Sequence, residues 1–227
     1  MIFEWFSEKG ISRNKNCDHL GVLNCNEFTI CFLMDAAERT SRSSDFAKQW
    51  TTTFIDALSK EDEFTNEVIS RHLKQNFDFH RRSFSAEIAS YACVLINKEK
   101  AYIISLCIGD CRVGTPNQEE KICWQNTIHT NANAMGELVD ESLLRNSQRN
   151  TLTKSLNSKR FCLPEIKEIA WNTELYIATD GWWVSYELKE NPEDDSSMLK
   201  IKLTSNDCHN ICNSDSENHY FLNLDSK

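Results

Sequence analysis

The segment LYIATDGWW (residues 175–183) joins an apolar strand candidate to an Asp-Gly pair that begins at Asp180. Two other apolar segments end in the same residue type: TICFLMD ends at Asp35 and SLCIGD ends at Asp110. Three strands that each end in an aspartate can bring carboxylates together at one edge of a sheet. Hard divalent cations such as Mg²⁺ and Mn²⁺ bind such oxygen clusters. Aspartate after a strand is also common in turns, because its side chain hydrogen-bonds to the nearby backbone. By themselves, the three segments indicate either turns or a metal site.

The pattern around these segments predicts an α+β chain. Apolar residues at helical spacing predict helices over residues 45–58 and 61–77, with Asp45 as the N-cap of the first. Residues 150–156 are predicted as a short helix and residues 189–197 as a solvated loop. Apolar and β-branched segments predict strands at residues 3–6, 27–35, 90–96, 101–108, 112–113, 122–124, 165–170, 174–179 and 218–224. This order of elements favours helices packed on antiparallel sheets.

Length and charge narrow the functional classes. The chain has 227 residues, 40% of them hydrophobic and 26% charged, as expected for a single globular domain over residues 1–227. It has 25 Lys and Arg against 34 Asp and Glu, so its formal net charge is -9. This charge argues against a nucleic-acid partner, because such binding depends on neutralising phosphates. The N-terminal sequence MIFEWFSEKG lacks the features of a secretory signal, and no apolar segment approaches the roughly 18 residues that span a bilayer. We therefore expect a cytoplasmic protein without membrane contact.

The ten cysteines are expected to be reduced. Cys31, Cys93 and Cys107 lie within apolar strand candidates, where a thiol packs as a small hydrophobic group. A cytoplasmic location also favours free thiols. Two alternatives remain open: a redox switch between Cys107 and Cys111, and a zinc site within residues 208–219, although the Cys and His spacing there lacks the usual tight pairing.

The order of these motifs resembles that of the metal-dependent type-2C (PPM) Ser/Thr protein phosphatases. The counterparts in this chain are RNKNCD (13–18), MDAAE (34–38), SYA (90–92), GDCR (109–112), TLTKSL (151–156), LPEI (163–166), ATDGWW (178–183) and ENHYFL (217–222). Together they span residues 10–224, and ATDGWW is the most specific of them. The Asp-Asn pair that opens the last strand in the family is represented by Glu217-Asn218. The resemblance implies a four-layer αββα sandwich, in which two antiparallel β-sheets are flanked by helices.

The resemblance also implies roles for the matching residues. In the family, water activated between two Mn²⁺ or Mg²⁺ ions hydrolyses phosphoserine and phosphothreonine in proteins. Arg13 and Asp18 are the implied catalytic residues: Arg13 clamps the substrate phosphate, for which a planar guanidinium is suited, and Asp18 orients metal-bound water. The implied metal ligands are Asp35, which bridges both ions, the carbonyl of Ala36, Asp180 and Glu217 at the first ion, and Asp110 at a third, weaker site found in some relatives.

Two departures from the family pattern bear on activity. Cys17 stands where the family has a Glu that helps to hold the second ion, and a thiol is a poor ligand for Mg²⁺. Ala37 stands where the family has a His, which is a candidate proton donor to the leaving group. Two main alternatives therefore stay open. One is a working metal-dependent protein phosphatase, and the other is a weak or inactive pseudophosphatase that acts as a binding module. Hydrolysis of a small phosphorylated metabolite is a third.

The expected partner follows from the same resemblance. The length of the chain is similar to that of the small bacterial members of the family, which commonly oppose a Ser/Thr kinase. We therefore expect a phosphorylated protein as substrate, either such a kinase or one of its targets.

Overall fold

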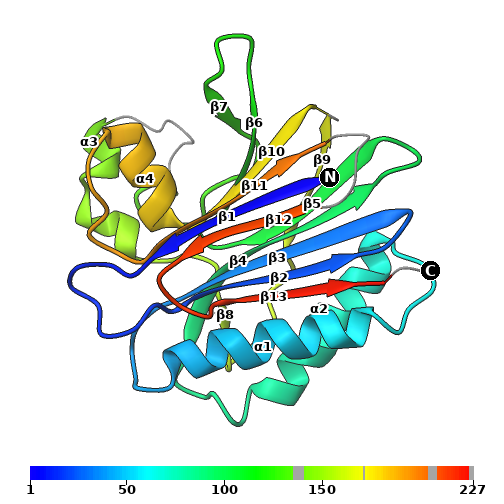
Figure 1. The fold of residues 1–227 in the computed structure, drawn as a ribbon. Coiled ribbons are helices and arrows are strands. Elements are labelled where there is room, and N and C mark those ends of the chain that lie inside the picture. Colours follow the sequence, from blue (N-terminus) through cyan, green and yellow to red (C-terminus); the bar gives the residue numbers. More distant parts are fainter. Residues whose placement is uncertain (135–140, 171, 204–208, 225–227) are drawn as a thin grey trace.

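The computed structural model describes residues 1–134, 141–170, 172–203 and 209–224 (Figure 1). Its strands are β1 (Ile2–Glu8), β2 (Asp18–Asn24), β3 (Phe28–Ala36), β4 (Ile88–Asn97), β5 (Tyr102–Ile108), β6 (Arg112–Pro116), β7 (Ile122–Trp124), β8 (Leu156–Asn157), β9 (Glu165–Ala170), β10 (Glu174–Ala178), β11 (Ser196–Lys202), β12 (His209–Ser214) and β13 (His219–Asn223). Its helices are α1 (Ser43–Leu58), α2 (Asn66–His80), α3 (Glu141–Leu144) and α4 (Asp180–Leu188), with a 3₁₀ turn at Ser147–Asn150.

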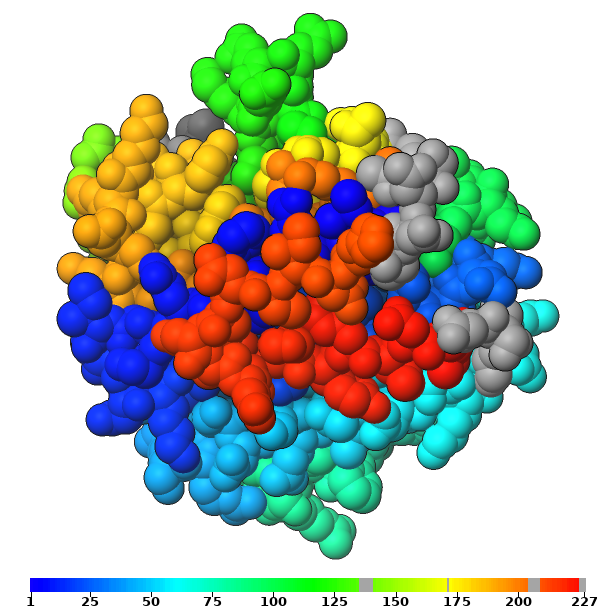
Figure 2. Space-filling model, viewed as in Figure 1, coloured from blue at the N-terminus to red at the C-terminus, as the bar shows by residue number. Residues whose placement is uncertain are grey.

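The described strands form two sheets that pack face to face. Sheet A has the order β12-β1-β11-β10-β6-β7, and sheet B has the order β13-β2-β3-β4-β5-β9, with β8 beside β4. Most neighbouring strands are antiparallel, as predicted. Two pairs are parallel, however: β12 with β1 and β13 with β2. The prediction of purely antiparallel sheets was therefore wrong at these edges, where the last two strands each run alongside one of the first two. Figure 1 shows β12 beside β1 and β13 beside β2, and Figure 2 shows the orange and red segments of β12 and β13 next to each other on one face of the molecule.

The apolar strands account for the central layer. Alternate residues of each strand point to opposite faces of a sheet. Phe3, Trp5 and Leu199 of sheet A and Leu33 of sheet B are fully buried in the core between the sheets. Strand β3 lies in the interior of sheet B, and both faces of the sheet are covered there. Its sequence is therefore continuously apolar and does not alternate with polar residues.

Helices α1 and α2 cover the outer face of sheet B (Figure 1). Phe32 of β3 lies in this layer, and its ring stacks on Trp50 of α1 with the ring centroids 5.1 Å apart. Helix α1 begins earlier than predicted, with Arg42 at the N-cap, so Asp45 lies in the first turn and is not the cap. Helix α2 begins at Asn66 and not at residue 61, because the Thr65 side chain caps it by accepting a hydrogen bond from the Val68 N–H at 3.3 Å.

The outer face of sheet A has a smaller helical layer. Helix α4 packs there through Trp183 and Val184, and the short α3 lies beside it (Figure 1). The pattern analysis missed α4, since the segment after Asp180 shows no clear amphipathic period. It also predicted a helix at residues 150–156, where the structure has the end of a 3₁₀ turn and the short β8.

Two further expectations concern thiols and the membrane. Nine cysteines are described and all are free; six of them, including Cys31, Cys93, Cys107 and Cys111, are buried. Cys208 lies outside the described residues, so the zinc alternative at residues 208–219 is not tested. Within the described ranges, no helix is long and apolar enough to cross a membrane.

Candidate metal centre

A small polar cavity opens at one end of the two sheets, where several of the predicted site residues meet. Its volume is about 170 Å³. It is lined by Arg13, Asp35, Ala36, Ala37, Glu38, Ile88, Ala89, Ser90, Asp110, Asn150, Leu152, Asp180, Asp194 and Asp195. Six of these side chains are carboxylates, five from Asp and one from Glu38, which makes the wall strongly acidic. The cavity therefore brings together residues that are up to about 180 positions apart in the sequence.

Strands β2 and β3 place two carboxylates side by side. Asp18 and Asp35 are direct partners in the antiparallel register, and Ser90 of β4 is the next partner of Asp35. The Asp18 carboxylate is buried, and its Oδ2 accepts a hydrogen bond from the Thr179 hydroxyl at 3.0 Å. Its Oδ1 has no hydrogen-bond partner among the described residues. A buried carboxylate oxygen without a partner is costly, and it indicates a position where a bound group completes the hydrogen bonding.

The turn after β5 positions Asp110. Gly109 has a φ of 86°, which glycine adopts without strain, and a Cβ there would lie only 2.0 Å from the Ser90 hydroxyl oxygen. The same hydroxyl donates to Asp110 Oδ1 at 2.6 Å. The indole N–H of Trp183 donates to the Asp110 carbonyl at 2.8 Å and so connects helix α4 to this turn.

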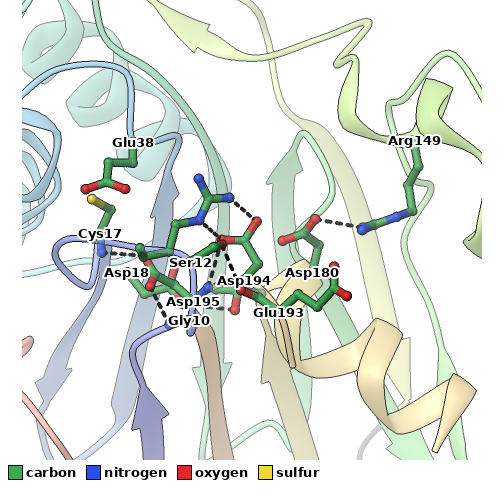
Figure 3. Close-up of polar contacts among 12 residues, drawn as sticks. Gly10, Ser12, Cys17, Asp18, Glu38, Arg149, Asp180, Glu193, Asp194 and Asp195 are labelled. Atoms are coloured by element: carbon green, nitrogen blue, oxygen red, sulfur yellow. Dashed lines mark hydrogen bonds and ion pairs between the residues drawn. The ribbon is translucent and has the colours of Figure 1, made fainter. Parts of the chain in front are cut away.

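Helix α4 starts at the cavity with Asp180. Thr179 is its N-cap residue and is fully buried; its hydroxyl binds Asp18 and also accepts from the Ser197 N–H at 3.0 Å. Asp180 Oδ2 accepts from Arg149 Nη1 at 2.7 Å, in an ion pair of which both side chains are mostly buried (Figure 3). An acidic residue in the first turn of a helix is also stabilised by the helix dipole.

Two acidic residues that the pattern analysis did not select enter the cavity before β11. Asp194 binds the Arg13 guanidinium through both carboxylate oxygens, with Arg13 Nε 2.6 Å from Oδ1. Asp195 is buried and accepts from the backbone N–H of Gly10 at 2.9 Å and of Cys17 at 2.8 Å. The available signal was the Asp-Asp pair directly before the strand-like segment SSMLKIK; this pair lies within residues 189–197, for which the pattern predicts a solvated loop.

The structure does not bring Glu217 to this cavity. Glu217 is exposed and lies in a separate depression with Lys9, Lys48 and Asp215. The structure therefore does not bring Glu217 beside Asp180, which is where the resemblance implies that it lies. The acidic pair that reaches the cavity precedes β11, which lies between β1 and β10 in sheet A, and not the last strand of the chain.

The clustered carboxylates raise each other's pKa. Burial is the largest cause for Asp18, Asp35 and Asp110, and the negative charges of neighbouring aspartates add to it. The pKa of Asp110 rises to about 7, even though Ser90 and Arg149 act in the opposite direction. The pKa of Cys17 is raised above its ordinary value, chiefly by burial. The adjacent carboxylates therefore resist full ionisation.

This repulsion predicts a pH dependence of stability in the presence of EDTA. A carboxyl whose pKa is higher in the folded than in the unfolded state stabilises the fold below about pH 4, and this stability is lost as the pH rises to about 7. The variant Asp110→Asn keeps an acceptor for Ser90 and removes the titration. We expect its free energy of unfolding, relative to wild type, to rise by more than about 1 kcal/mol between pH 5 and pH 8, since one pKa unit corresponds to about 1.4 kcal/mol.

Urea unfolding at the two pH values checks this expectation. Taking the difference between variant and wild type cancels the titration of the carboxyl groups that do not interact with Asp110. A difference that stays constant from pH 5 to pH 8 would contradict the raised pKa of Asp110.

The donor chemistry of the cavity fits hard divalent cations. All of its acidic donors are oxygens, which Mg²⁺ and Mn²⁺ prefer, and the unpartnered Asp18 Oδ1 lies on the residue paired with Asp35. Within the described part of the chain, no group of three or more His, Cys, Asp or Glu side chains forms a preformed metal site. The ion pairs Arg13–Asp194 and Arg149–Asp180 engage two of the acidic donors instead. A cation can therefore bind Asp194 or Asp180 only if it displaces the arginine that is paired with that carboxylate.

Comparisons with known proteins were made for the sequence and for the fold. No protein-family model matches the sequence, and no curated protein matches it. Among solved structures, the chain is similar to the serine/threonine phosphatase Stp1 from Staphylococcus aureus, with a TM-score of 0.78 and 15% identity over 89% of this chain and 95% of that one. It is also similar to the PPM Ser-Thr phosphatase MsPP from Mycobacterium smegmatis, with a TM-score of 0.72 and 14% identity over 89% and 98% of the two chains.

The Mycobacterium tuberculosis serine/threonine phosphatase PstP/Ppp gives a similar result, with a TM-score of 0.70 and 11% identity over 88% of this chain and 97% of that one. In each case nearly the whole length of both chains is superimposed, so the likeness covers both sheets and their helices. At these identities the likeness concerns the fold and not the chemistry. The chain has the α+β sandwich fold of the bacterial PPM-type Ser/Thr phosphatases, which confirms the fold that the sequence motifs predicted.

Proposed function

We propose that this protein is a metal-dependent phosphatase that hydrolyses phosphoserine and phosphothreonine in proteins. The observation that carries the proposal is the acidic cavity in a PPM-type fold, with Asp35, Asp180 and Asp194 arriving from three separate segments. The retained ATDG motif at the start of α4 supports it.

The residues divide into ligands and positioning groups. We propose Asp35, Asp180, Asp194 and the carbonyl of Ala36 as ligands of two Mn²⁺ or Mg²⁺ ions, with Asp110 available to a third. When bound, such ions lower the pKa of water and neutralise charge on a phosphate.

The remaining groups hold the water and the substrate. Asp18 accepts a hydrogen bond from the attacking water at its unpartnered Oδ1 and thereby orients that water. Arg13 binds two phosphate oxygens once a cation releases it from Asp194, because its fork of N–H donors matches both carboxylate and phosphate. Ala37 supplies no proton, so the leaving group takes its proton from solvent.

The substrate and location follow from the same proposal. We propose a phosphorylated protein as substrate, either a Ser/Thr kinase or its targets, and a cytoplasmic site of action. The groove next to the cavity supports a peptide substrate: it has a volume of about 540 Å³, and Arg13, Asn150, Asp180 and Asp194 line both. A peptide in this groove can direct its phosphate toward the carboxylates.

Metal dependence tests the proposal directly. Hydrolysis of a phosphothreonine peptide is expected with Mn²⁺ or Mg²⁺ and is expected to stop with EDTA. Asp194→Asn is expected to reduce the rate at least about 100-fold, since it removes a proposed metal ligand and metal-ion catalysis contributes several kcal/mol. The matched variant Glu217→Gln removes the same charge from the separate depression and is expected to keep the wild-type rate.

Other outcomes have distinct meanings. Equal effects of the two variants would contradict the placement of the metal centre at Asp194. Faster turnover of small phosphorylated metabolites than of the peptide would favour the metabolite alternative over a protein substrate.

A second candidate function is that of a binding module without catalysis. The observation that favours it is that Arg13 and Arg149 already neutralise Asp194 and Asp180. Two guanidinium groups can stabilise the cavity as cations do, which would leave a phosphatase fold that needs no metal. Calorimetry decides between the two: Mn²⁺ binding at two sites supports the enzyme, whereas a folded protein that binds no Mn²⁺ supports the binding module.

A further inference from the structure

Cys17 is not arranged as a ligand in this cavity. It is buried, and its Sγ lies 3.7 Å from the Lys15 carbonyl oxygen, to which the thiol donates. Its backbone N–H is bound by Asp195. Cys17 does not line the cavity, although it lines the adjoining depression. The thiol at this position therefore cannot replace the carboxylate that type-2C phosphatases have there.

Glu38 brings a carboxylate to the same place from another segment. It follows β3 by two residues and lines both the cavity and the depression that contains Cys17. Figure 3 shows its carboxylate next to the sulfur of Cys17. The Asn14 N–H lies 3.2 Å from Oε1 and 3.3 Å from Oε2, so the Glu38 side chain is held against the loop that carries Arg13 and Cys17.

From this arrangement we propose that Glu38 supplies the carboxylate for the second divalent cation, beside Asp35, in place of the missing Glu at position 17. The inference rests on the proposed function, because it presupposes a cation at Asp35. Glu38 lines the same cavity as Asp35, three residues later in the chain, so its carboxylate would be available to an ion that Asp35 holds. Position 38 and position 17 lie on facing segments, so one can replace the other as the source of an oxygen ligand.

The neighbouring acidic side chains are less suited to this role. Both oxygens of Asp195 already accept backbone N–H groups, from Gly10 and Cys17. Glu193 is exposed and lines the adjacent groove but not the cavity. Glu38 lines the cavity, and within the described residues its carboxylate accepts a hydrogen bond only from the Asn14 N–H, which a cation can displace.

Titration calorimetry with Mn²⁺ tests the inference on the full chain, independently of activity. Wild type is expected to bind two Mn²⁺ ions. Glu38→Gln is expected to retain one site and to weaken the other at least about 10-fold, the size of effect found when a group that supports a metal site is removed. Cys17→Ala is expected to leave both sites unchanged. The matched control Glu193→Gln removes a charge from the adjacent loop and is also expected to leave both unchanged.

A swap extends the test. In the double variant Cys17→Glu with Glu38→Gln, the second site is expected to return to within about threefold of wild type. If either variant at position 38 fails to fold, as judged by circular dichroism, Glu38→Asp keeps the charge on a shorter arm and is expected to weaken only the second site.

The failures are distinguishable. Wild type with no Mn²⁺ bound would overturn both this inference and the proposed function. Two sites that persist unchanged in Glu38→Gln, or a site that is lost in Cys17→Ala, would overturn the role of Glu38 and leave the proposed phosphatase standing.

Discussion

Asp35→Asn is expected to lower kcat/KM for a phosphothreonine peptide by about 1,000-fold or more and to raise the melting temperature of the metal-free protein. The loss of rate follows from the bridging role that the family resemblance implies for Asp35, because metal-ion catalysis contributes several kcal/mol and each 1.36 kcal/mol is a factor of ten. The gain in stability follows from the neighbouring charges: Asp18, Asp180 and Asp110 all raise the pKa of Asp35, so a neutral amide removes repulsion.

The opposite signs of the two effects make this prediction specific. A variant that only disrupted folding would lose both activity and thermal stability. The measurement is therefore paired: peptide hydrolysis with Mn²⁺, and thermal unfolding with EDTA. Asp45→Asn, in the exposed first turn of α1, is the control and is expected to change neither quantity appreciably. More than a tenth of wild-type activity in Asp35→Asn would argue against a bridging role.

Phe32→Ala is expected to reduce the free energy of unfolding by about 3–5 kcal/mol, as is usual when a large buried aromatic side chain is removed. Phe32 is completely buried and contacts three other rings, namely Trp50 at 5.1 Å, Phe54 at 4.8 Å and Tyr91 at 5.3 Å between centroids. The loss is a large share of the 5–15 kcal/mol that typically stabilises a domain.

Urea unfolding measures this loss. The matched variant is Phe79→Ala, because Phe79 is 71% exposed, and a change below about 0.5 kcal/mol is expected there. A loss below about 1.5 kcal/mol in Phe32→Ala would mean that the layer between α1 and sheet B repacks around the missing ring. Because Phe32 is three residues before Asp35 on β3, we also expect Mn²⁺ binding to weaken.

Local patterns determined most of the secondary structure. The segments that became β3, β4 and β5 are apolar and rich in β-branched residues, a composition and length that favour buried strands over helices. The prediction failed where the local signal was weak. Helix α4 has no clear amphipathic face, and the 3₁₀ turn and β8 replaced the helix expected at residues 150–156 because contacts with distant segments decide the conformation of such short stretches.

The fold class and the carboxylates that follow apolar strands, Asp35, Asp110 and Asp180, could be predicted from the sequence, because strand period is a local property and the order of the motifs can be read along the chain. Only the tertiary structure decided which other acidic residues join them. Asp194 reaches the cavity because β11 inserts between β1 and β10, whereas Glu217 precedes an edge strand of the other sheet and stays outside. Likewise, the position of Glu38 beside Cys17 depends on how the loop after β3 folds back (Figure 3). Strand order and loop closure are set by packing between residues far apart in the chain, which no local pattern records.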